Sequence, residues 1–204
     1  MNHINSDRIS LWDQAHIWNT ATVEAFARGG VGAYLNTPGF PRNGNQLVAG
    51  VAHWRQAILE LQAAQMRITN IPILYGIDSI HGAQRVDKAV LFPQNINTGA
   101  TFNPTLVYDY GKYMARDTKA AGILWIFNPT LDITRHKHWP RVYETYGEDP
   151  VGVAATATAV VTGIQSQGVA ACFKQFIGDS DTRSGNDRDA VALTFELLIS
   201  RRLS

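Results

Sequence analysis

Short apolar segments alternate with longer helical segments along the chain, and this alternation restricts the fold more than any other feature. Strands are expected at 31–35, 73–77, 123–127 and 169–173. Helices are expected at 12–27, 49–66, 104–121 and 151–165. Connections long enough to contain a helix allow neighbouring strands to pair in parallel. The sequence therefore predicts an α/β fold in which parallel strands alternate with helices.

Two of the helices carry the same start signal. Asn103-Pro104 and Asp149-Pro150 each place a capping side chain before a proline at the first helical position. Gly122 is expected to end the first of these helices. These signals fix where the crossovers begin.

Two architectures fit four parallel strands: a partial (β/α)8 TIM-type barrel and an open doubly wound sheet. No glycine-rich fingerprint follows any of the strands, which favours the barrel. A complete barrel needs about 250 residues, and the chain has 204. We therefore expect residues 1–204 to form a single, incomplete barrel domain, whose opening segment 2–20 lacks a lead-in strand.

The strand at 73–77 ends at Asp78. In parallel α/β folds, ligands bind at the carboxyl ends of strands, because the loops converge there. An aspartate after a strand also commonly caps the following turn. From the strand alone, ligand binding and turn capping are both open for Asp78.

Four ordered motifs bear on this choice: GIDSIHG at 76–82, LFPQNIN at 91–97, WPRVYETYGEDP at 139–150 and AACFKQFIGD at 170–179. Their order and spacing resemble glycoside hydrolase family 3 from about Gly30 to about Leu198. The resemblance implies a β-glucosidase-like barrel domain that hydrolyses terminal β-D-glucosyl residues with retention of configuration. It also implies that Asp78, Arg141 and Lys174 bind the sugar, in keeping with the strong, directional bonds that charged groups make to hydroxyls.

The chain departs from the family pattern at two places. Gln175 stands where the family has histidine, and it cannot become a cation. Retaining hydrolysis needs two carboxyl groups about 5 Å apart, and no segment here resembles the one that carries the family's nucleophile. We therefore assign no catalytic residue within these 204 and expect the remaining part of the barrel to supply them. Gln175 and Asp179 are expected to border the sugar pocket.

Other side chains receive structural interpretations. Glu144 is expected to position Arg141, His81 to bond nearby backbone, and Cys172 to be a small buried strand residue. His136 and His138 alternate on a loop, but without a third ligand they fall short of a metal site. No metal and no cofactor is implied.

The composition of the chain restricts the kinds of molecule that it is expected to bind. A net charge of +1 with 17% charged residues gives no case for nucleic acid or a membrane surface. We expect a small neutral β-glucoside or oligosaccharide. No signal peptide is recognisable, although relatives of this type are often secreted, so the compartment stays open. The alternative function is a catalytically silent sugar-binding or structural remnant.

Overall fold

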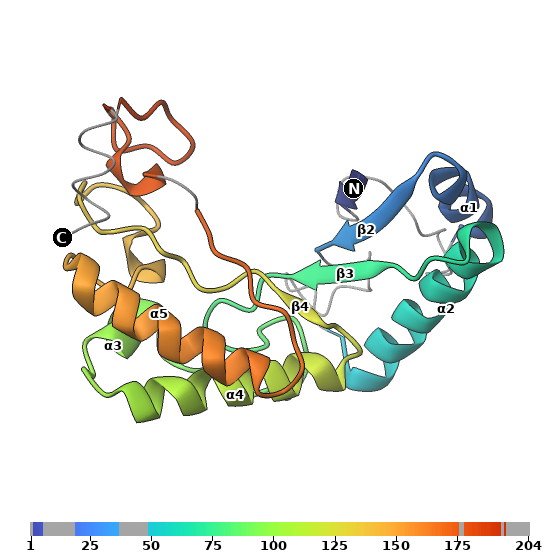
Figure 1. Cartoon of the computed structure of the whole chain (residues 1–204), viewed down its shortest axis with the longest axis horizontal. Helices are drawn as coiled ribbons and strands as arrows, with labels where there is room; N and C mark the ends of the chain where they lie inside the picture. The colour runs from blue at the N-terminus through green and yellow to red at the C-terminus, as the bar shows by residue number, and fades with distance from the viewer. Residues whose placement is uncertain (1, 6–18, 37–48, 176–177, 193, 195–204) are drawn as a thin grey trace.

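The computed structural model describes residues 2–5, 19–36, 49–175, 178–192 and 194. Within them, four parallel strands form one sheet in the order β1-β2-β3-β4 (Figure 1). The strands are β1 (Asn2–Asn5), β2 (Val31–Leu35), β3 (Leu74–Ile77) and β4 (Trp125–Ile126). The α-helices are α1 (Thr20–Arg28), α2 (Val51–Thr69), α3 (Asn95–Gly99), α4 (Pro104–Ala120) and α5 (Pro150–Gln165), and two 3-10 helices follow the strands, η1 (Val142–Glu144) and η2 (Asp179–Asp181). None of the described helices is long and apolar enough to span a lipid bilayer.

The predicted starts of α4 and α5 are confirmed. The side chain of Asn103 accepts hydrogen bonds from the backbone N–H groups of Thr105 and Leu106, both at 3.1 Å. The side chain of Asp149 caps α5 by accepting a hydrogen bond from the backbone N–H of Gly152 at 2.8 Å. Gly122 follows the end of α4 with a φ of 85°, a conformation that favours glycine. α1 is shorter than predicted, since it begins at Thr20, and residues 12–18 lie outside the described residues.

Two predictions about strands are wrong. The opening segment does contain a strand, β1, which pairs in parallel with β2; its polar sequence conceals it, because backbone pairing does not depend on apolar side chains. Residues 169–173 form no regular strand. They meet the neighbouring segment at an isolated bridge of Ala170 with Trp125 and at a bond from Cys172 N–H to Asn128 O, and Lys174 adds a second isolated bridge with Thr130. Pro129 has no N–H to donate between these bridges, which interrupts the ladder.

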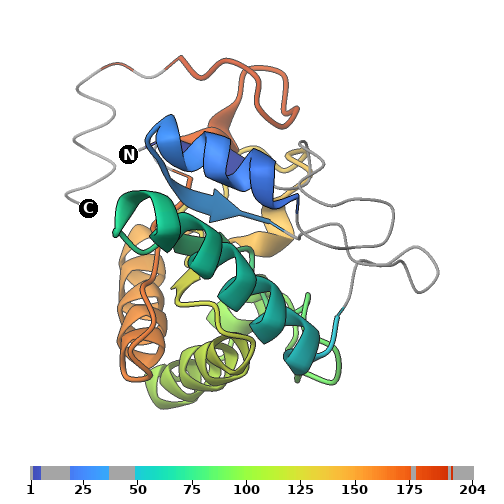
Figure 2. The ribbon, with the colours of Figure 1, turned by 90° about the vertical axis from the view of Figure 1, so that its right-hand side faces the viewer.

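Both hydrophobic cores lie on the same face of the sheet. Ile77 belongs to the core formed with α1 and α2, and Ile126 to the core formed with α4 and α5. These two isoleucines are direct partners in the parallel ladder, so their side chains point to the same side. Figure 2 shows α1 and α2 side by side in front of α4 and α5. Helices on one face are the arrangement of a (β/α) barrel, whereas a doubly wound sheet has helices on both. The described chain is therefore part of a TIM-type barrel.

Helices α4 and α5 approach each other through glycines. A Cβ atom at Gly163 would lie 2.2 Å from the carbonyl oxygen of Tyr108, and one at Gly111 would lie 2.5 Å from that of Val160. Each distance is shorter than van der Waals contact and involves backbone, which cannot rotate away. The spacing between α4 and α5 is thus set by main-chain atoms.

We expect Gly163→Ala to lower the free energy of unfolding by about 1–3 kcal/mol, although alanine is the better helix former. The added methyl group would force α5 away from Tyr108. Thr158→Ala, at an exposed position of the same helix, should change stability by about 0.5 kcal/mol or less. Urea denaturation followed by circular dichroism measures both, and a stabilised Gly163→Ala would contradict the close contact.

Candidate functional site

Three segments meet at the carboxyl ends of the strands. They are the residues after β3, the loop after β4, and the extended segment 170–175, which passes β4 in Figure 1 before it rises towards η2. Lys174 N–H donates to Pro129 O at 3.1 Å, and Cys172 N–H donates to Asn128 O at 3.1 Å. Backbone bonds therefore hold the third segment against the second.

Asp78 and Lys174 form an ion pair across 96 residues of sequence, with Lys174 Nζ 2.6 Å from Asp78 Oδ1. The lysine side chain is only 15% exposed, whereas that of Asp78 is 38% exposed. Asp78 is therefore the partner that faces solvent. Among the described residues, no hydrogen bond is found to its second oxygen, Oδ2.

Arg141 lies at the start of η1 and is held by Glu144. Arg141 Nε and Nη2 donate to the two carboxylate oxygens of Glu144 at 3.0 and 2.6 Å. Asp187 lies 3.8 Å from Nη1, and the guanidinium lies 5.9 Å from the Trp139 ring centroid. Burial works to lower the pKa of Arg141, but the bond and charge of Glu144 and the charge of Asp187 raise it overall. The prediction that Glu144 positions Arg141 is confirmed.

The loop that carries Arg141 sits on α3. A Cβ atom at Gly99 would lie 2.1 Å from the carbonyl oxygen of Tyr146. Asn95, in the same helix, donates from its side chain to Glu144 O at 2.9 Å. The end of the loop that bears Glu144 therefore rests directly on helix backbone and a buried amide.

Asp132 is a buried carboxylate in the same loop, 3% exposed. Its Oδ2 accepts from Gln175 N–H at 2.8 Å and its Oδ1 from Ser180 N–H at 3.2 Å. Burial raises the pKa of Asp132, the two backbone bonds oppose this, and the charge of Asp179 adds to the rise while that of Arg141 counters it. Asp132 thereby joins the loop after β4 to Gln175 and to Ser180.

The Gln175 side chain lies between Asp132 and Arg141. With its amide nitrogen towards Asp132, it donates to Oδ2 at 3.1 Å, and its oxygen accepts from Arg141 Nη2 at 2.7 Å. Asp179 interacts electrostatically with both Arg141 and Asp187, and burial followed by the charge of Asp187 raises its pKa. Gln175 and Asp179 thus lie beside Arg141.

The five predicted site residues fall into two adjoining groups. Asp78 and Lys174 contact each other, and Gln175, the next residue, lies with Asp179 beside Arg141. The sequence did not single out Asp132 or assign Asp187 to Arg141. Asp132 had one usable signal, since it stands between Leu131 and Ile133, and a charge among apolar residues must be paired when buried. Asp187 has no such signal.

The histidines and the cysteine that received structural interpretations lie outside the two groups of site residues. His81 Nδ1 bonds the backbone oxygen of Phe92 at 2.8 Å, which confirms its structural interpretation. Cys172 is half-buried rather than buried and lies outside any strand, so that prediction is wrong; burial raises the pKa of its thiol. The His136 and His138 rings lie 5.6 Å apart, and the described residues contain no cluster of three His, Cys, Asp or Glu side chains that could hold a metal ion.

The chain is similar to one family of known proteins by family model and by sequence. A model of the glycosyl hydrolase family 3 N-terminal domain matches residues 14–203. The lysosomal beta glucosidase of Dictyostelium discoideum is 34% identical over 184 residues, which cover 82% of this chain and 22% of that protein. A beta-glucosidase of Rhizobium radiobacter is 34% identical over 135 residues, or 65% of this chain and 16% of that protein.

Solved structures share the fold. The exo-1,3/1,4-beta-glucanase of a Pseudoalteromonas species is 33% identical with a TM-score of 0.75, covering 91% of this chain and 23% of that one. A b-glucosidase of Erythrobacter marinus is 25% identical with a TM-score of 0.76, covering 92% and 24%. The chain thus spans roughly a fifth of the length of these proteins.

We expect Glu144→Gln to destabilise the chain by about 3 kcal/mol, because it removes the charge that compensates the partly buried guanidinium of Arg141. Glu148→Gln makes the same change at an exposed position nearby and should cost about 0.5 kcal/mol or less. Chemical denaturation at pH 7 measures both. Equal effects would show that the Arg141–Glu144 pair contributes no more than a surface charge.

The raised pKa of Asp132 gives a pH dependence with a definite sign. The folded state takes up this proton at a higher pH than the unfolded state, so the contribution of Asp132 to stability increases as pH falls through the raised value. Wild type should therefore gain stability relative to Asp132→Asn between pH 7 and about pH 4, near the unfolded pKa of aspartate. Denaturation curves at several pH values test this, and a relative loss would mean that the folded pKa is lowered.

Proposed function

The chain belongs to glycosyl hydrolase family 3, through its N-terminal domain, and from this premise we propose that it forms the sugar-binding part of a β-glucosidase-like hydrolase. The proposed substrates are β-glucosides or oligosaccharides with a terminal, non-reducing β-D-glucosyl residue. The ion pair between Asp78 and Lys174 carries this proposal, because it brings a solvent-facing carboxylate and a cation from distant segments to one strand end.

The residue types at this strand end suit a neutral polyol. Asp78 offers a carboxylate acceptor, and Lys174 and Arg141 offer charged donors in directions fixed by Asp78 and Glu144. Bonds to charged groups are stronger and more directional than neutral ones. We propose that these three residues bind the hydroxyls of one sugar unit, with Gln175 and Asp179 at the border of the pocket.

The proposed reaction is hydrolysis with retention, in which one carboxylate attacks the anomeric carbon and a second group acts as acid and base. We assign neither role to a described residue. Asp78 is paired with Lys174, Glu144 is doubly bonded to Arg141, and Asp132 is bonded to two backbone N–H groups. These carboxylates bind and position groups rather than react.

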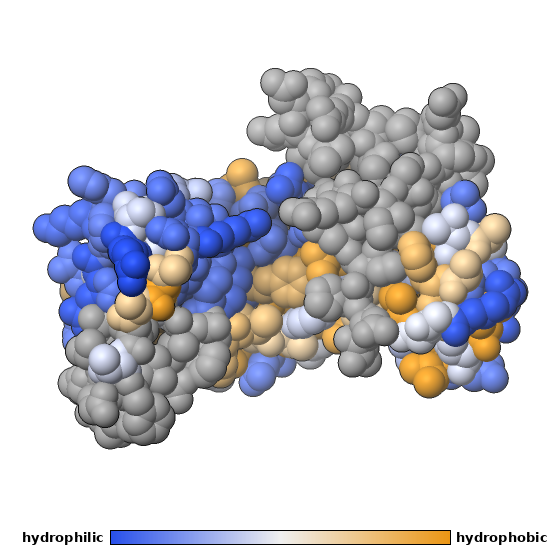
Figure 3. All heavy atoms as spheres, turned by 90° about the horizontal axis from the view of Figure 1, so that it is seen from above, coloured by the Kyte–Doolittle hydropathy of each residue, from blue (hydrophilic) through white to orange (hydrophobic). Residues whose placement is uncertain are grey.

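The face of the sheet opposite the helices is partly apolar. The rings of Trp125 and Phe127 pack edge to face, 4.8 Å apart, over Gly76, where a Cβ would lie 2.4 Å from the Phe127 ring. Phe173 is 61% exposed. Seen from the side away from α4, apolar residues gather in the middle of the molecule (Figure 3). We propose that further strands of the barrel cover this face in the active protein.

Binding and turnover of simple sugars test the function. We expect the chain to bind D-glucose and Asp78→Asn to weaken binding about 10- to 100-fold, as for the loss of a hydrogen bond to a charged group. Asp87→Asn, an exposed carboxylate after the same strand, is the matched control and should bind as wild type does. Isothermal titration calorimetry gives the affinities.

Hydrolysis of 4-nitrophenyl β-D-glucoside completes the test. Turnover that depends on Asp78 would support the hydrolase and place a reacting carboxylate within this chain. Binding without turnover would support a sugar-binding chain that is catalytically silent by itself. Absence of both from the folded chain would contradict the proposed function.

A further inference from the structure

We propose that Asp132 is the residue that positions the backbone of Gln175 and Ser180 beside the sugar site, and that the Gln175 side chain is a link from Asp132 to Arg141 rather than a direct sugar contact. The inference deepens the proposed function and rests on it. It follows from the hydrogen bonds that converge on one buried carboxylate.

Asp132 joins three parts of the site. It lies in the loop after β4, it receives the N–H of Gln175, and it receives the N–H of Ser180 in η2. A further hydrogen bond supports the connection to Ser180, since Ser180 Oγ donates to Ile133 O at 2.5 Å. Lys174, whose Nζ contacts Asp78, directly precedes Gln175. Backbone bonds to Pro129 and Leu131 hold Lys174, and Asp132 continues this attachment by holding the backbone N–H groups of Gln175 and Ser180.

A carboxylate is needed at this position. The two N–H donors approach different oxygens, Oδ2 and Oδ1, and only an ionised carboxyl offers two acceptors with no competing donor. Asparagine would turn an NH₂ group towards one of the two N–H groups. The buried charge of Asp132 is thus compensated mainly by the backbone of the segment that it positions.

The orientation of the Gln175 amide follows from this carboxylate. Asp132 accepts from the amide nitrogen at 3.1 Å, so the amide oxygen faces Arg141 and accepts from Nη2 at 2.7 Å and from Nη1. Both ends of the side chain are then occupied. Gln175 acts on a ligand through Arg141.

Arg141 has few donors left after these bonds. Nε and Nη2 serve Glu144, and Nη2 and Nη1 serve Gln175. Of the five N–H groups of arginine, one on Nη1 remains, with Asp187 3.8 Å away. Asp132, Gln175 and Glu144 together therefore fix which single N–H group Arg141 can offer to a sugar.

Amide hydrogen exchange by NMR on the whole chain tests the first part. In Asp132→Asn, the backbone amides of Gln175 and Ser180 should exchange roughly tenfold faster or more, because their acceptor is weakened. The Phe92 amide, bonded to His81 O, should be unaffected, and Asp87→Asn should change none of the three. Unchanged exchange at Gln175 and Ser180 would overturn the proposal.

A double-mutant cycle tests the second part. Gln175→Met removes the amide but keeps the backbone bond to Asp132, so it should weaken D-glucose binding while the Gln175 amide stays protected. If Asp132 acts through this amide, Asp132→Asn combined with Gln175→Met should bind about as weakly as the weaker single variant. If the losses of binding free energy in the two single variants add up in the double variant, the link is overturned. A purely structural Asp132 would not produce this coupling.

The two measurements separate this inference from the proposed function. If wild type binds no glucose, the proposed function fails, but exchange at Gln175 and Ser180 still decides the role of Asp132. If Asp132→Asn does not fold, Gln175→Met alone still tests the link, because wild-type glucose affinity in that variant would overturn it.

Discussion

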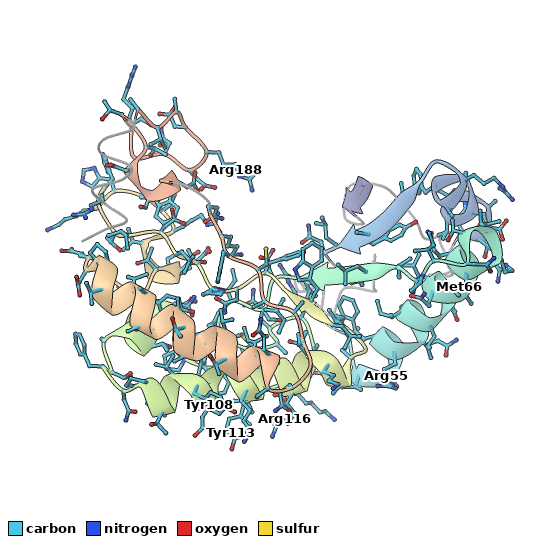
Figure 4. The ribbon with its side chains drawn as sticks, viewed as in Figure 1. Arg55, Met66, Tyr108, Tyr113, Arg116 and Arg188 are labelled. Carbon is cyan, nitrogen blue, oxygen red and sulfur yellow. The ribbon has the colours of Figure 1, made fainter. Side chains whose placement is uncertain are left out.

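The placement of α1, α2, α4 and α5 on one face of the sheet is the constraint on which the rest of the structure depends. Because Ile77 and Ile126 are ladder partners and enter the two cores from the same side, each crossover returns over that face. The loops after the strands then emerge at one end of the sheet. Side chains as distant in sequence as Asp78 and Lys174 meet there, while Tyr108, Tyr113 and Arg116 lie on the far side of α4 (Figure 4).

The site is organised by unequal burial within its charged groups. The better buried member of the Asp78–Lys174 pair is the cation, whereas in the Arg141–Glu144 pair it is the carboxylate. In each pair, the more buried partner is compensated by the more exposed one. The buried charge of Asp132 is also compensated, in this case by two backbone N–H groups. Fixed charges with one accessible side are suited to a ligand that carries hydroxyls and no charge.

Sequence reasoning succeeded where the determinants are local. The caps at Asn103 and Asp149 could be predicted, because they depend on neighbouring backbone, and so could β2 and the pairing of Arg141 with Glu144 three residues on. β1 and the irregular 169–173 segment could not, since both depend on how a partner strand presents its backbone. The same holds within the site: Asp78 and Lys174 were found through motifs, but the bonds from Asp132 to Gln175 and Ser180 exist only in the folded chain.

The contact between Gly99 and Tyr146 has an evolutionary consequence. Main chain touches main chain at this point, so any side chain in place of Gly99 would push the adjoining η1 segment away. Residues 135–138, by contrast, include exposed positions. Insertions and deletions are therefore expected to accumulate before Trp139, where they would not displace Arg141.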